Sequence, residues 1–427
     1  MTDKPERVAV IGLGYVGLPL AVAFCQNGFG VTGIDLDHQR LGQLEKGKSY
    51  IQDVSSETIA DCLKSGRFRV SSEYQALSQA EAIIVCVPTP LRKTKDPDMS
   101  YVVDAAERIS PHLRRGQLVI LESTVYPGAT EELIQPLLER PDLAAGREFH
   151  LAFSPERVDP GNRQFSLRQI PKVIGGLTPA CAERAQQLYE AIFDRVLTVG
   201  SLKEAELTKL LENTFRSVNI GLINELALMA HKMGINIWSV IEAAATKPFG
   251  FMPFYPGPGL GGHCIPLDPF YLSWKAKSYG ADARFIELAG EVNGKMPAYV
   301  VTRIMELLNQ KGKLLRGAKL LILGVAYKRD INDLRESPAL DIIDLLEERG
   351  AQVSYHDPHV PEFAHRGRER RSAELSEKLL ARQDCVVIVT AHSAFDYGYI
   401  AEHTPLIFDT RNATQGLAGR FANIEVL

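Results

Sequence analysis

Short apolar runs alternate with helix-like stretches along the first part of this chain. The runs are rich in Val and Ile and lie at 8–11, 31–35, 83–87, 118–121 and 172–175. Strands that alternate with helices in this way predict a parallel, doubly wound α/β sheet. The pattern returns at 319–323, 351–355, 385–389 and 406–409, which predicts a second domain of the same class.

A segment with the residue spacing of a helix lies between these two regions. Large apolar residues recur there at steps of three and four, at Leu207, Leu211, Phe215, Val218, Leu222, Leu226, Met229 and Met233, and Gly234 follows as a stop signal. We interpret the stripe as core packing, and a helix of this length also suggests a dimer seam. The predicted fold is therefore α/β, with two doubly wound Rossmann-like domains at 1–198 and 301–427 joined by a long central helix within a helical region at 199–300.

The regular pattern stops at 247–270. This segment holds six prolines and five glycines, so it is expected to be neither helix nor strand. Its aromatic residues favour an ordered loop over disorder, and long loops inside compact enzymes are usually functional.

Composition narrows the class of protein. A formal net charge of −4 gives no basic excess for nucleic-acid binding, and no apolar run is long enough to span a membrane. The charged N-terminus runs directly into a predicted strand, which leaves no room for a signal peptide, so we expect a soluble, cytoplasmic protein. Six scattered cysteines show no zinc-binding spacing and no metal is expected; five resemble buried apolar residues, whereas Cys264 does not.

A glycine fingerprint follows the first predicted strand. Gly12, Gly14 and Gly17 lie between that strand and a helical run, as the dinucleotide-binding GxGxxG pattern requires. Asp35 ends the second strand, where a carboxylate can bind the adenosine ribose. Asp35 and Asp37 favour NAD over NADP because they repel a 2′-phosphate, although the nearby Arg40 weakens this inference.

Cys264 lies in a glycine-rich loop and is a candidate nucleophile. NAD can oxidise an alcohol to an aldehyde, and a thiolate that adds to the aldehyde gives a thiohemiacetal, which can lose a second hydride and form a thioester. Both oxidations develop alkoxide character, so a cation is expected at the reacting oxygen. Lys209 and Asn213, one turn apart on the predicted long helix, are candidates for that place.

The assembled motifs resemble the UDP-glucose/UDP-N-acetylhexosamine 6-dehydrogenase family over nearly the whole chain. They include VIGLGYVGLPLA, ESTVYPG (122–128), SPERVDPG (154–161), ELTKLLENTF, GGHCIPLDP (261–269) and GVAYKRDINDLRESPA (324–339). The UDP-glucose branch carries a second glutamate four residues after Glu156, where this chain has Pro160, so the SPER form is similar to the N-acetylhexosamine branch. The stretch before Cys264 is similar to UDP-N-acetylglucosamine members, which favours that sugar over UDP-N-acetylmannosamine and UDP-glucose.

The resemblance also implies roles for individual residues. Cys264 would be the nucleophile, Lys209 the acid/base at the reacting oxygen, and Glu156 the base of thioester hydrolysis, with Asn213, Thr124 and Asp268 ordering water and the reacting oxygen. The implied NAD contacts are Gly12, Gly14, Tyr15, Val16, Gly17, Asp35, Arg40, Thr89, Thr124 and Arg335. The implied UDP-sugar contacts are Arg157, Val158, Lys209, Asn213, Arg216, Gly261, Tyr327 and Lys328, in a homodimer or higher homo-oligomer.

Two other functions use the same cofactor. A nucleotide-sugar epimerase or dehydratase needs a Tyr-x-x-x-Lys pair, and Tyr271 and Lys275 have that spacing. We disfavour this function because the pair follows the proline-rich loop and is expected outside the first domain. A catalytically silent NAD-binding regulator is the other alternative, and release of NADH distinguishes all three.

Overall fold

The computed structural model describes residues 7–51, 53–92, 96–158, 165–262, 265–417 and 419–427. The chain divides into two units. Unit 1 comprises 1–212 and 270–282, and unit 2 comprises 213–269 and 283–427. The long helix α7 (Leu202–Lys232) and the short helix α9 (Asp268–Lys277) each contribute residues to both units.

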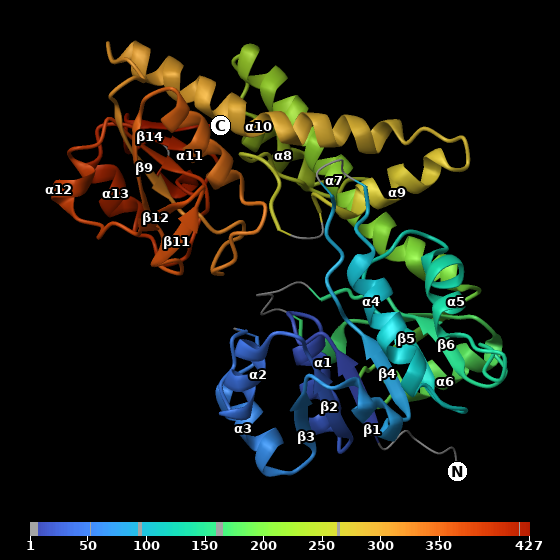
Figure 1. The fold of residues 1–427 in the computed structure, drawn as a ribbon. Helices are drawn as coiled ribbons and strands as arrows, with labels where there is room; N and C mark the ends of the chain where they lie inside the picture. Colours follow the sequence, from blue (N-terminus) through green and yellow to red (C-terminus); the bar gives the residue numbers. More distant parts are fainter. Residues whose placement is uncertain (1–6, 52, 93–95, 159–164, 263–264, 418) are drawn as a thin grey trace. The chain divides into compact units, whose positions relative to one another are not determined.

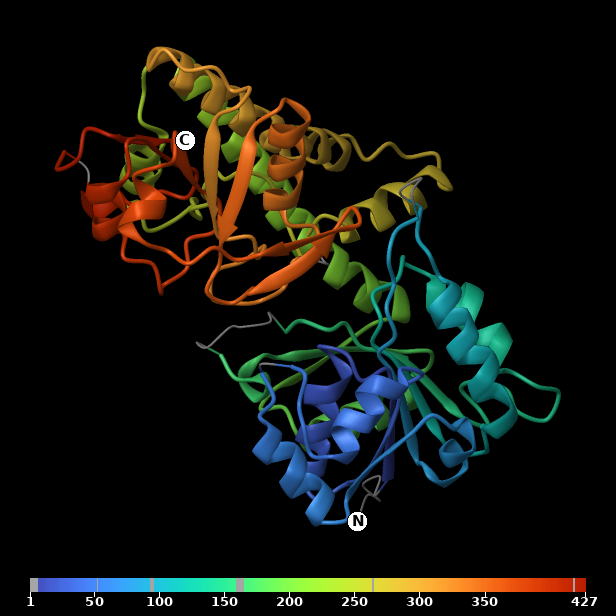
Figure 2. The same cartoon turned by 60° about the vertical axis from the view of Figure 1, so that its left-hand side comes forward.

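Unit 1 is built on an eight-stranded sheet, seen from two directions in Figures 1 and 2. Its order is β3-β2-β1-β4-β5-β6-β7-β8. The strands are β1 (Arg7–Ile11), β2 (Gly30–Ile34), β3 (Phe68–Ser71), β4 (Ala82–Val85), β5 (Leu118–Leu121), β6 (His150–Phe153), β7 (Lys172–Gly176) and β8 (Val196–Val199). The prediction of a purely parallel sheet is wrong at one pair, because β6 and β7 run antiparallel.

Helices cover both faces of this sheet because its strands are apolar on both sides. Val8 and Val10 pack with α1 (Gly17–Gln26), α3 (Ser56–Lys64) and α6 (Pro179–Tyr189). Ala9 and Ile11 point to the other face, against α4 (Ser100–Ile109), α5 (Gln135–Leu138) and the start of α7. The alternation places successive strand residues in separate cores, as expected for a doubly wound sheet.

Unit 2 contains a five-stranded parallel sheet of order β10-β9-β13-β14-β15. Its strands are β9 (Lys319–Leu323), β10 (Gln352–His356), β13 (Cys385–Ile388), β14 (Ile407–Asp409) and β15 (Ile424–Val426). One face packs against α10 (Arg284–Gln310) and α11 (Pro338–Glu348), and the other against α12 (Glu377–Leu380) and α13 (Tyr397–His403). The two Rossmann-like domains and the long central helix are therefore confirmed.

The predicted packing of the α7 stripe in the core is wrong. Its large apolar residues are exposed on this chain, with Leu211 at 62%, Met229 at 51% and Met233 at 67% of their full accessible surface. The predicted helix itself is present, and it ends before Gly234, whose φ of +69° suits glycine. The described residues of the proline-rich segment, 247–262 and 265–267, are irregular as predicted, and α9 already begins at Asp268.

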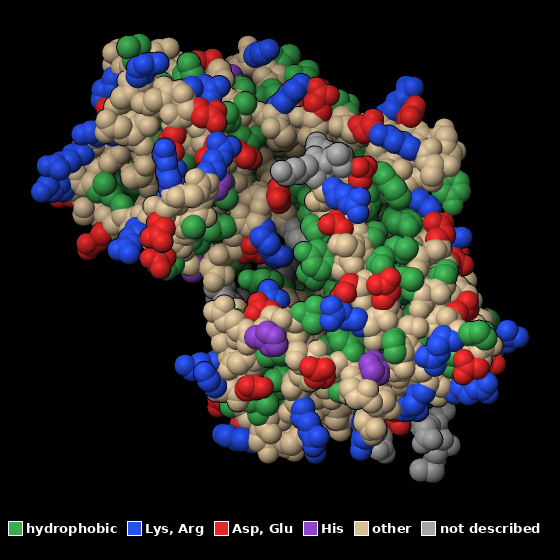
Figure 3. Space-filling view, viewed as in Figure 1, with side chains coloured by type: hydrophobic (Ala, Val, Ile, Leu, Met, Phe, Trp, Pro, Cys, Tyr) green, Lys and Arg blue, Asp and Glu red, His purple; other side chains and the backbone are tan. Residues whose placement is uncertain are grey.

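The surface carries both signs of charge. Figure 3 shows Lys and Arg interspersed with Asp and Glu on the face in view. Among the helices of the described residues, none is both long and apolar enough to cross a membrane. The cytoplasmic location stays a prediction.

Candidate functional site

The glycine fingerprint lies where β1 passes into α1. A Cβ on Gly12, which has φ of +88°, would lie 2.6 Å from the main-chain oxygen of Cys86, and one on Gly17 would lie 1.9 Å from the oxygen of Gly12. A Cβ on Gly14 meets nothing within 4 Å. Gly12 and Gly17 are thus required by the turn, whereas the space beside Gly14 is open to a ligand.

A cavity of about 240 Å³ adjoins this turn. Gly12, Gly14, Asp35 and Arg40 all line it, together with apolar residues including Ile34 and Val87. Asp37 and Asp104 also line it, so apolar walls that suit an adenine ring stand beside carboxylates that can bind ribose hydroxyls. The N-terminus of α1 has no side-chain cap, so its main-chain N–H groups can bind an anion such as a pyrophosphate.

Asp35 is held firmly at the edge of that cavity. Its carboxylate accepts hydrogen bonds from the main-chain nitrogens of Leu13 (2.8 Å) and Asp37 (2.9 Å). The guanidinium of Arg40 lies 3.6 Å from it and also pairs with Asp37 at 3.3 Å. Arg40 therefore already has two carboxylate partners, which leaves it less available for a 2′-phosphate.

The other predicted cofactor residues of unit 1 lie on two further loops and at the start of α1. Tyr15 and Val16 are half-buried just before α1, and Thr124 is half-buried after β5. Thr89 is buried after β4, and its carbonyl oxygen accepts a 2.8 Å hydrogen bond from the hydroxyl of Tyr271. These loops all follow the carboxyl ends of parallel strands, the edge where doubly wound sheets bind ligands.

Glu156 and Lys209 are brought together in unit 1. Both are 7% exposed, and the Lys209 ammonium donates a hydrogen bond to the main-chain carbonyl oxygen of Glu156. The Glu156 carboxylate accepts hydrogen bonds from the main-chain nitrogens of Arg157 (2.8 Å) and Val158 (2.6 Å). Arg157 in turn pairs with Glu212 of α7 at 2.7 Å.

A buried charged network lies behind Glu156, and the sequence analysis missed it. The Lys172 ammonium lies 2.9 Å from a carboxylate oxygen of Glu122 and 3.7 Å from one of Glu156. The Tyr189 hydroxyl donates a hydrogen bond to the other oxygen of Glu122. Glu122 directly follows the apolar run 118–121 and Lys172 begins the run 172–175, so a charge at the end of each strand was the available signal.

The charges in this network shift one another's pKa. Burial raises the pKa of Glu122 to about 7, against the opposing effects of Lys172 and Tyr189. Burial alone would also raise the pKa of Glu156, but Lys172, Lys209 and the N–H of Val158 outweigh it and hold that pKa below its ordinary value. Burial raises the pKa of the nearby Cys86 thiol well above its usual range.

The remaining predicted residues belong to unit 2. Asn213 donates a 2.6 Å hydrogen bond to Asp268, and both are buried. A Cβ on Gly261 would lie 2.6 Å from the Cβ of Tyr327, and the N–H of Gly262 donates to the carbonyl of Arg335 at 2.9 Å. Unit 2 thus brings the predicted residues Gly261, Tyr327 and Arg335 together.

Two more predicted contacts of unit 2 lie nearer the surface. Arg216 is exposed on α7, and Lys328 is half-buried after β9. The side chain of Arg335 is held by Asp333, with the closest nitrogen 2.6 Å from the carboxylate. None of these positions tests the predicted contacts with a sugar nucleotide.

Cys264 lies outside the described residues, so its predicted role as nucleophile stays a prediction. The other five cysteines are free and buried, as expected: Cys25, Cys62, Cys86, Cys181 and Cys385. Their burial leaves them poorly placed to attack a substrate.

Tyr271 and Lys275 lie in unit 1, so the stated reason for disfavouring an epimerase was wrong. Tyr271 is fully buried, and its hydroxyl is bonded to main-chain oxygens of the 89–90 loop. Lys275 forms an ion pair with Glu132 at 2.6 Å. Both side chains therefore serve packing within unit 1.

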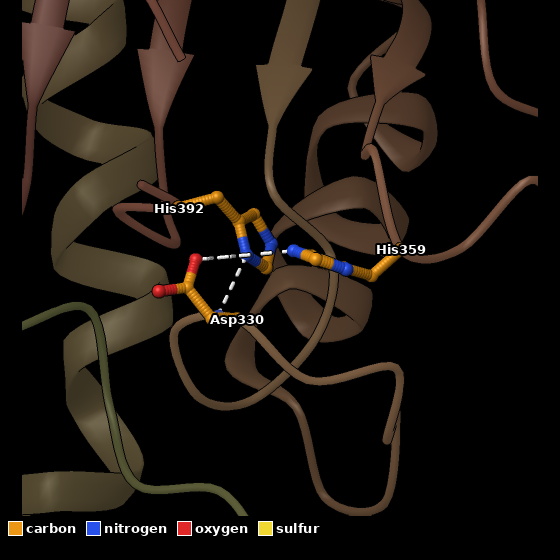
Figure 4. Close-up of side chains that lie close together, drawn as sticks. All are labelled: Asp330, His359 and His392. Carbon is orange, nitrogen blue, oxygen red and sulfur yellow. Dashed lines mark hydrogen bonds and ion pairs between the residues drawn. The ribbon is translucent and has the colours of Figure 1, made fainter. Parts of the chain in front are cut away.

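One further cluster of unit 2 has the residue types of a metal site. Asp330, His359 and His392 converge in Figure 4, with ligand-type atoms within 4.8 Å of one another. However, Nδ1 of His392 accepts a 2.9 Å hydrogen bond from the Asp330 N–H, while its Nε2 lies 3.0 Å from Asp357. A metal ion would have to displace that N–H, so the geometry favours a hydrogen-bonded support for the loop over a metal site.

Arg411 of unit 2 was also not singled out from the sequence. It donates to the carbonyl of Val389 at 2.9 Å, and a Cβ on Gly257 would lie 2.6 Å from its guanidinium. Burial lowers its pKa to about 10, and with Trp238 and Tyr255 it lines a cavity of about 330 Å³. A guanidinium beside aromatic rings can bind an anionic or planar group.

Comparison with known proteins assigns the three parts of the chain. The NAD-binding domain of the UDP-glucose/GDP-mannose dehydrogenase family matches residues 6–193, its central domain matches 203–295, and its UDP-binding domain matches 321–416. A UDP-N-acetyl-D-glucosamine 6-dehydrogenase of Pseudomonas aeruginosa is 40% identical over 84% of both chains. A UDP-N-acetyl-D-mannosamine dehydrogenase of Methanococcus maripaludis is 33% identical over 95% of this chain and 93% of its own length.

Solved structures agree. The structure of a UDP-D-ManNAc dehydrogenase from Pyrococcus horikoshii covers 98% of both chains at 33% identity, with a TM-score of 0.88. A UDP-glucose dehydrogenase from Pyrobaculum islandicum covers all of this chain at 28% identity, with a TM-score of 0.85. The family models match both the NAD-binding and the UDP-binding parts, and the relatives cover most of the chain. The chain therefore belongs to the UDP-glucose/GDP-mannose dehydrogenase family and is an NAD-dependent nucleotide-sugar dehydrogenase.

Proposed function

We propose that this chain oxidises the C6 hydroxyl of UDP-N-acetylglucosamine to the carboxylate, with release of two NADH. The observation that carries this proposal is the buried pair of Lys209 and Glu156 in a family member whose cofactor cavity is formed by Gly12, Gly14 and Asp35. The 40% identical Pseudomonas aeruginosa relative supports the choice of sugar. When bound in this cavity, NAD would supply the hydride acceptor for both oxidations.

The residues of the chain divide the remaining work. In the proposed scheme Lys209 accepts the proton of the C6 hydroxyl and stabilises the alkoxide as each hydride leaves. The thiolate of Cys264 adds to the aldehyde carbon between the two oxidations. Glu156 then takes a proton from water as the water oxygen attacks the thioester carbon. The carbon–sulfur bond breaks, the thiolate returns to Cys264 and the uronate is released.

The stoichiometry of NADH tests the reaction. We expect two NADH and one uronate per UDP-sugar. One NADH per sugar, or none together with an altered stereocentre, contradicts the proposal and would favour an alcohol dehydrogenase or an epimerase.

Two variants test the assigned residues. Cys264→Ser should abolish production of the acid, and undiminished acid production would show that the nucleophile lies elsewhere. Lys209→Ala should lose rate and keep its affinity for NAD in an equilibrium titration. Loss of NAD binding instead would assign Lys209 to the cofactor site.

UDP-N-acetylmannosamine is the second candidate substrate. Relatives from Methanococcus maripaludis and Pyrococcus horikoshii, at 33–35% identity, carry that name. Turnover measured on a panel of UDP-N-acetylglucosamine, UDP-N-acetylmannosamine and UDP-glucose decides between them. The highest kcat/KM on either of the other sugars contradicts our choice.

We also propose that a second copy of the chain covers the exposed stripe of α7. Leu211, Leu222 and Met229 are each more than half exposed along α7, and Met233, also more than half exposed, directly follows it. A series of large apolar side chains on one helix favours a partner helix. Light scattering of the purified protein should give the mass of a dimer or a higher oligomer. Met229→Lys should shift it toward the monomer, whereas Glu183→Lys, a charge reversal at an exposed position of α6 outside the stripe, should not.

A further inference from the structure

The network behind Glu156 is charged although it lies in the interior of unit 1. Lys172 is 3% exposed, Glu122 is 1% exposed and Tyr189 is fully buried. Burial of an ion costs several kcal/mol unless its partners compensate for the lost water. A lysine kept in such a place, beside a predicted catalytic carboxylate, therefore needs an explanation beyond packing.

The contacts of Glu156 show how its carboxylate is held. Oε1 accepts from the main-chain nitrogens of Arg157 and Val158, and Oε2 faces the Lys172 ammonium at 3.7 Å. Lys209 donates its hydrogen bond to the main-chain carbonyl of Glu156 and not to the carboxylate. Lys172 is thus the ammonium that faces the reactive end of Glu156 among the described ion pairs.

Lys172 is itself fixed from behind. Glu122 at the end of β5 accepts from its ammonium at 2.9 Å, and Tyr189 of α6 donates to the same carboxylate. The ammonium also lies 5.1 Å from the ring centre of Tyr189 and 5.4 Å from that of Phe193. These contacts prevent the long lysine side chain from moving toward water.

We propose that Lys172 is a positioning residue of the hydrolytic step, which fixes the Glu156 carboxylate as an anion while Glu122 and Tyr189 anchor Lys172. The inference rests on the proposed function, in which Glu156 accepts a proton from the attacking water. Lys172 makes no contact with the reacting atoms in this scheme. It acts through Glu156, because a nearby cation disfavours protonation of a carboxylate.

The groups that face Glu156 come from every surrounding element. They are Glu122 after β5, Lys172 on β7, Lys209 on α7 and, near Glu122, Tyr189 on α6 and Cys86 after β4. Of these, Lys172 has the largest effect that favours the Glu156 anion, and its removal should raise the pKa of Glu156. Loss of an opposite charge at this range raises a carboxyl pKa by roughly one to three pH units.

The test is the pH dependence of steady-state turnover together with the initial burst of NADH. In Lys172→Met, we expect the acid limb of kcat to move upward by about one pH unit or more, with NAD affinity and the NADH burst retained. Lys172→Arg keeps the positive charge, so its acid limb of kcat should lie at the wild-type pH. Glu122→Gln leaves Lys172 charged, and the amide can still donate a hydrogen bond to Glu156, so its acid limb should not move upward.

Controls separate a positioning role from a merely structural one. Lys203→Met removes a surface lysine that pairs with Glu131 in the same unit and should leave the pH profile unchanged. If Lys172→Met does not fold, the double variant Lys172→Met/Glu122→Gln removes both buried charges and should still show the raised limb. Equal loss of turnover at every pH, with the limb unmoved, overturns the inference.

A separate variant tests the underlying assignment. Glu156→Gln should release the NADH burst and then stall before the acid is formed. If Glu156→Gln retains the wild-type rate and profile, the proposed function of Glu156 fails. If Glu156→Gln stalls while the Lys172→Met limb stays in place, the role of Lys172 alone fails.

Discussion

Glu206 shows how a buried carboxylate can hold the loop after β5. It is fully buried on α7, and its carboxylate accepts from the main-chain nitrogens of Gly128 (2.5 Å) and Thr130 (2.9 Å) and from the hydroxyl of Thr130 (2.7 Å). The segment held in this way follows Thr124, for which we propose a role at the reacting oxygen. Glu206 thereby ties the loop after β5 to the helix that carries Lys209.

Burial makes this carboxyl sensitive to pH near neutrality. It raises the pKa of Glu206 from 4.5 to about 7, although the three hydrogen bonds oppose the shift. The folded protein thus holds this proton more tightly than the unfolded chain. The stabilising contribution is complete below about pH 4.5 and is lost as the pH rises through about 7.

Glu206→Gln tests this dependence. Glutamine cannot accept all three hydrogen bonds, so the variant should be less stable than the wild type at about pH 5. Because glutamine does not ionise, the gap in free energy of unfolding should narrow by up to about 3 kcal/mol by about pH 8.5. Urea unfolding at both pH values measures the gap, Glu204→Gln is the control, and a constant gap contradicts the assignment.

The helix α7 has an inverted distribution of side chains. Its exposed positions include large apolar residues such as Leu211 and Met229, whereas Glu206, Lys209 and Asn213 are buried. A sequence rule that places apolar positions inside predicts the helix and its length correctly but assigns the wrong face to the core. The rule fails because the inner face of α7 carries polar side chains that form hydrogen bonds within the chain, such as those of Glu206 and Asn213, beside buried apolar residues such as Leu210.

The loop after β9 depends on a support that its own sequence does not reveal. The buried carboxylate of Asp357 accepts from the main-chain nitrogens of Val325 (2.7 Å) and Ala326 (3.1 Å). His392 binds the same carboxylate and also accepts from the N–H of Asp330, as Figure 4 shows for the latter pair. The two ends of the segment 325–330 are thus fixed by residues that follow β10 and β13.

His392→Phe should loosen this loop while filling the same volume. The Asp357 carboxylate and the Asp330 N–H each lose a hydrogen-bond partner. Because the loosened loop carries the predicted substrate contacts Tyr327 and Lys328, we expect KM for the UDP-sugar to rise about tenfold, with a smaller effect on kcat. His403→Phe on α13 is the matched control. Steady-state kinetics measure both constants, and an unchanged KM would contradict the predicted substrate contacts of the loop.

The same cluster predicts the outcome of metal binding. Since both nitrogens of His392 are occupied by hydrogen bonds, titration with Co²⁺ should give no ligand-field spectrum and dialysis against a chelator should leave activity unchanged. Co²⁺ bound in the wild type and lost in His392→Phe would contradict this reading.

The path of the chain joins parts that are distant in sequence. Unit 1 is completed by 270–282, which follows the proline-rich loop. Tyr271 is fully buried in the core of unit 1, Lys275 pairs with Glu132, and Trp274 packs on Tyr126 with ring centres 5.1 Å apart. The glycine turn and the most apolar strands were predictable because their signals are local, whereas β3, β6, β8 and β15, which lack long apolar runs, were missed. This return of the chain was not, since it depends on contacts across more than 100 residues.

Tyr271→Ala tests whether this returning segment supports the cofactor site. The side chain is fully buried and its hydroxyl bonds the carbonyl of Thr89, a predicted NAD contact. Truncation of a buried aromatic ring costs about 3–5 kcal/mol, so the free energy of unfolding should fall by that order and NAD affinity should weaken.

Tyr271→Phe removes the hydrogen bond alone and should cost about 1 kcal/mol. Tyr279→Ala, at a side chain 71% exposed on the same segment, should change neither quantity measurably. Urea unfolding and calorimetric titration with NAD give both values. If Tyr271→Ala lowered stability and left NAD affinity intact, the segment would support the core of unit 1 without shaping the loop that carries Thr89.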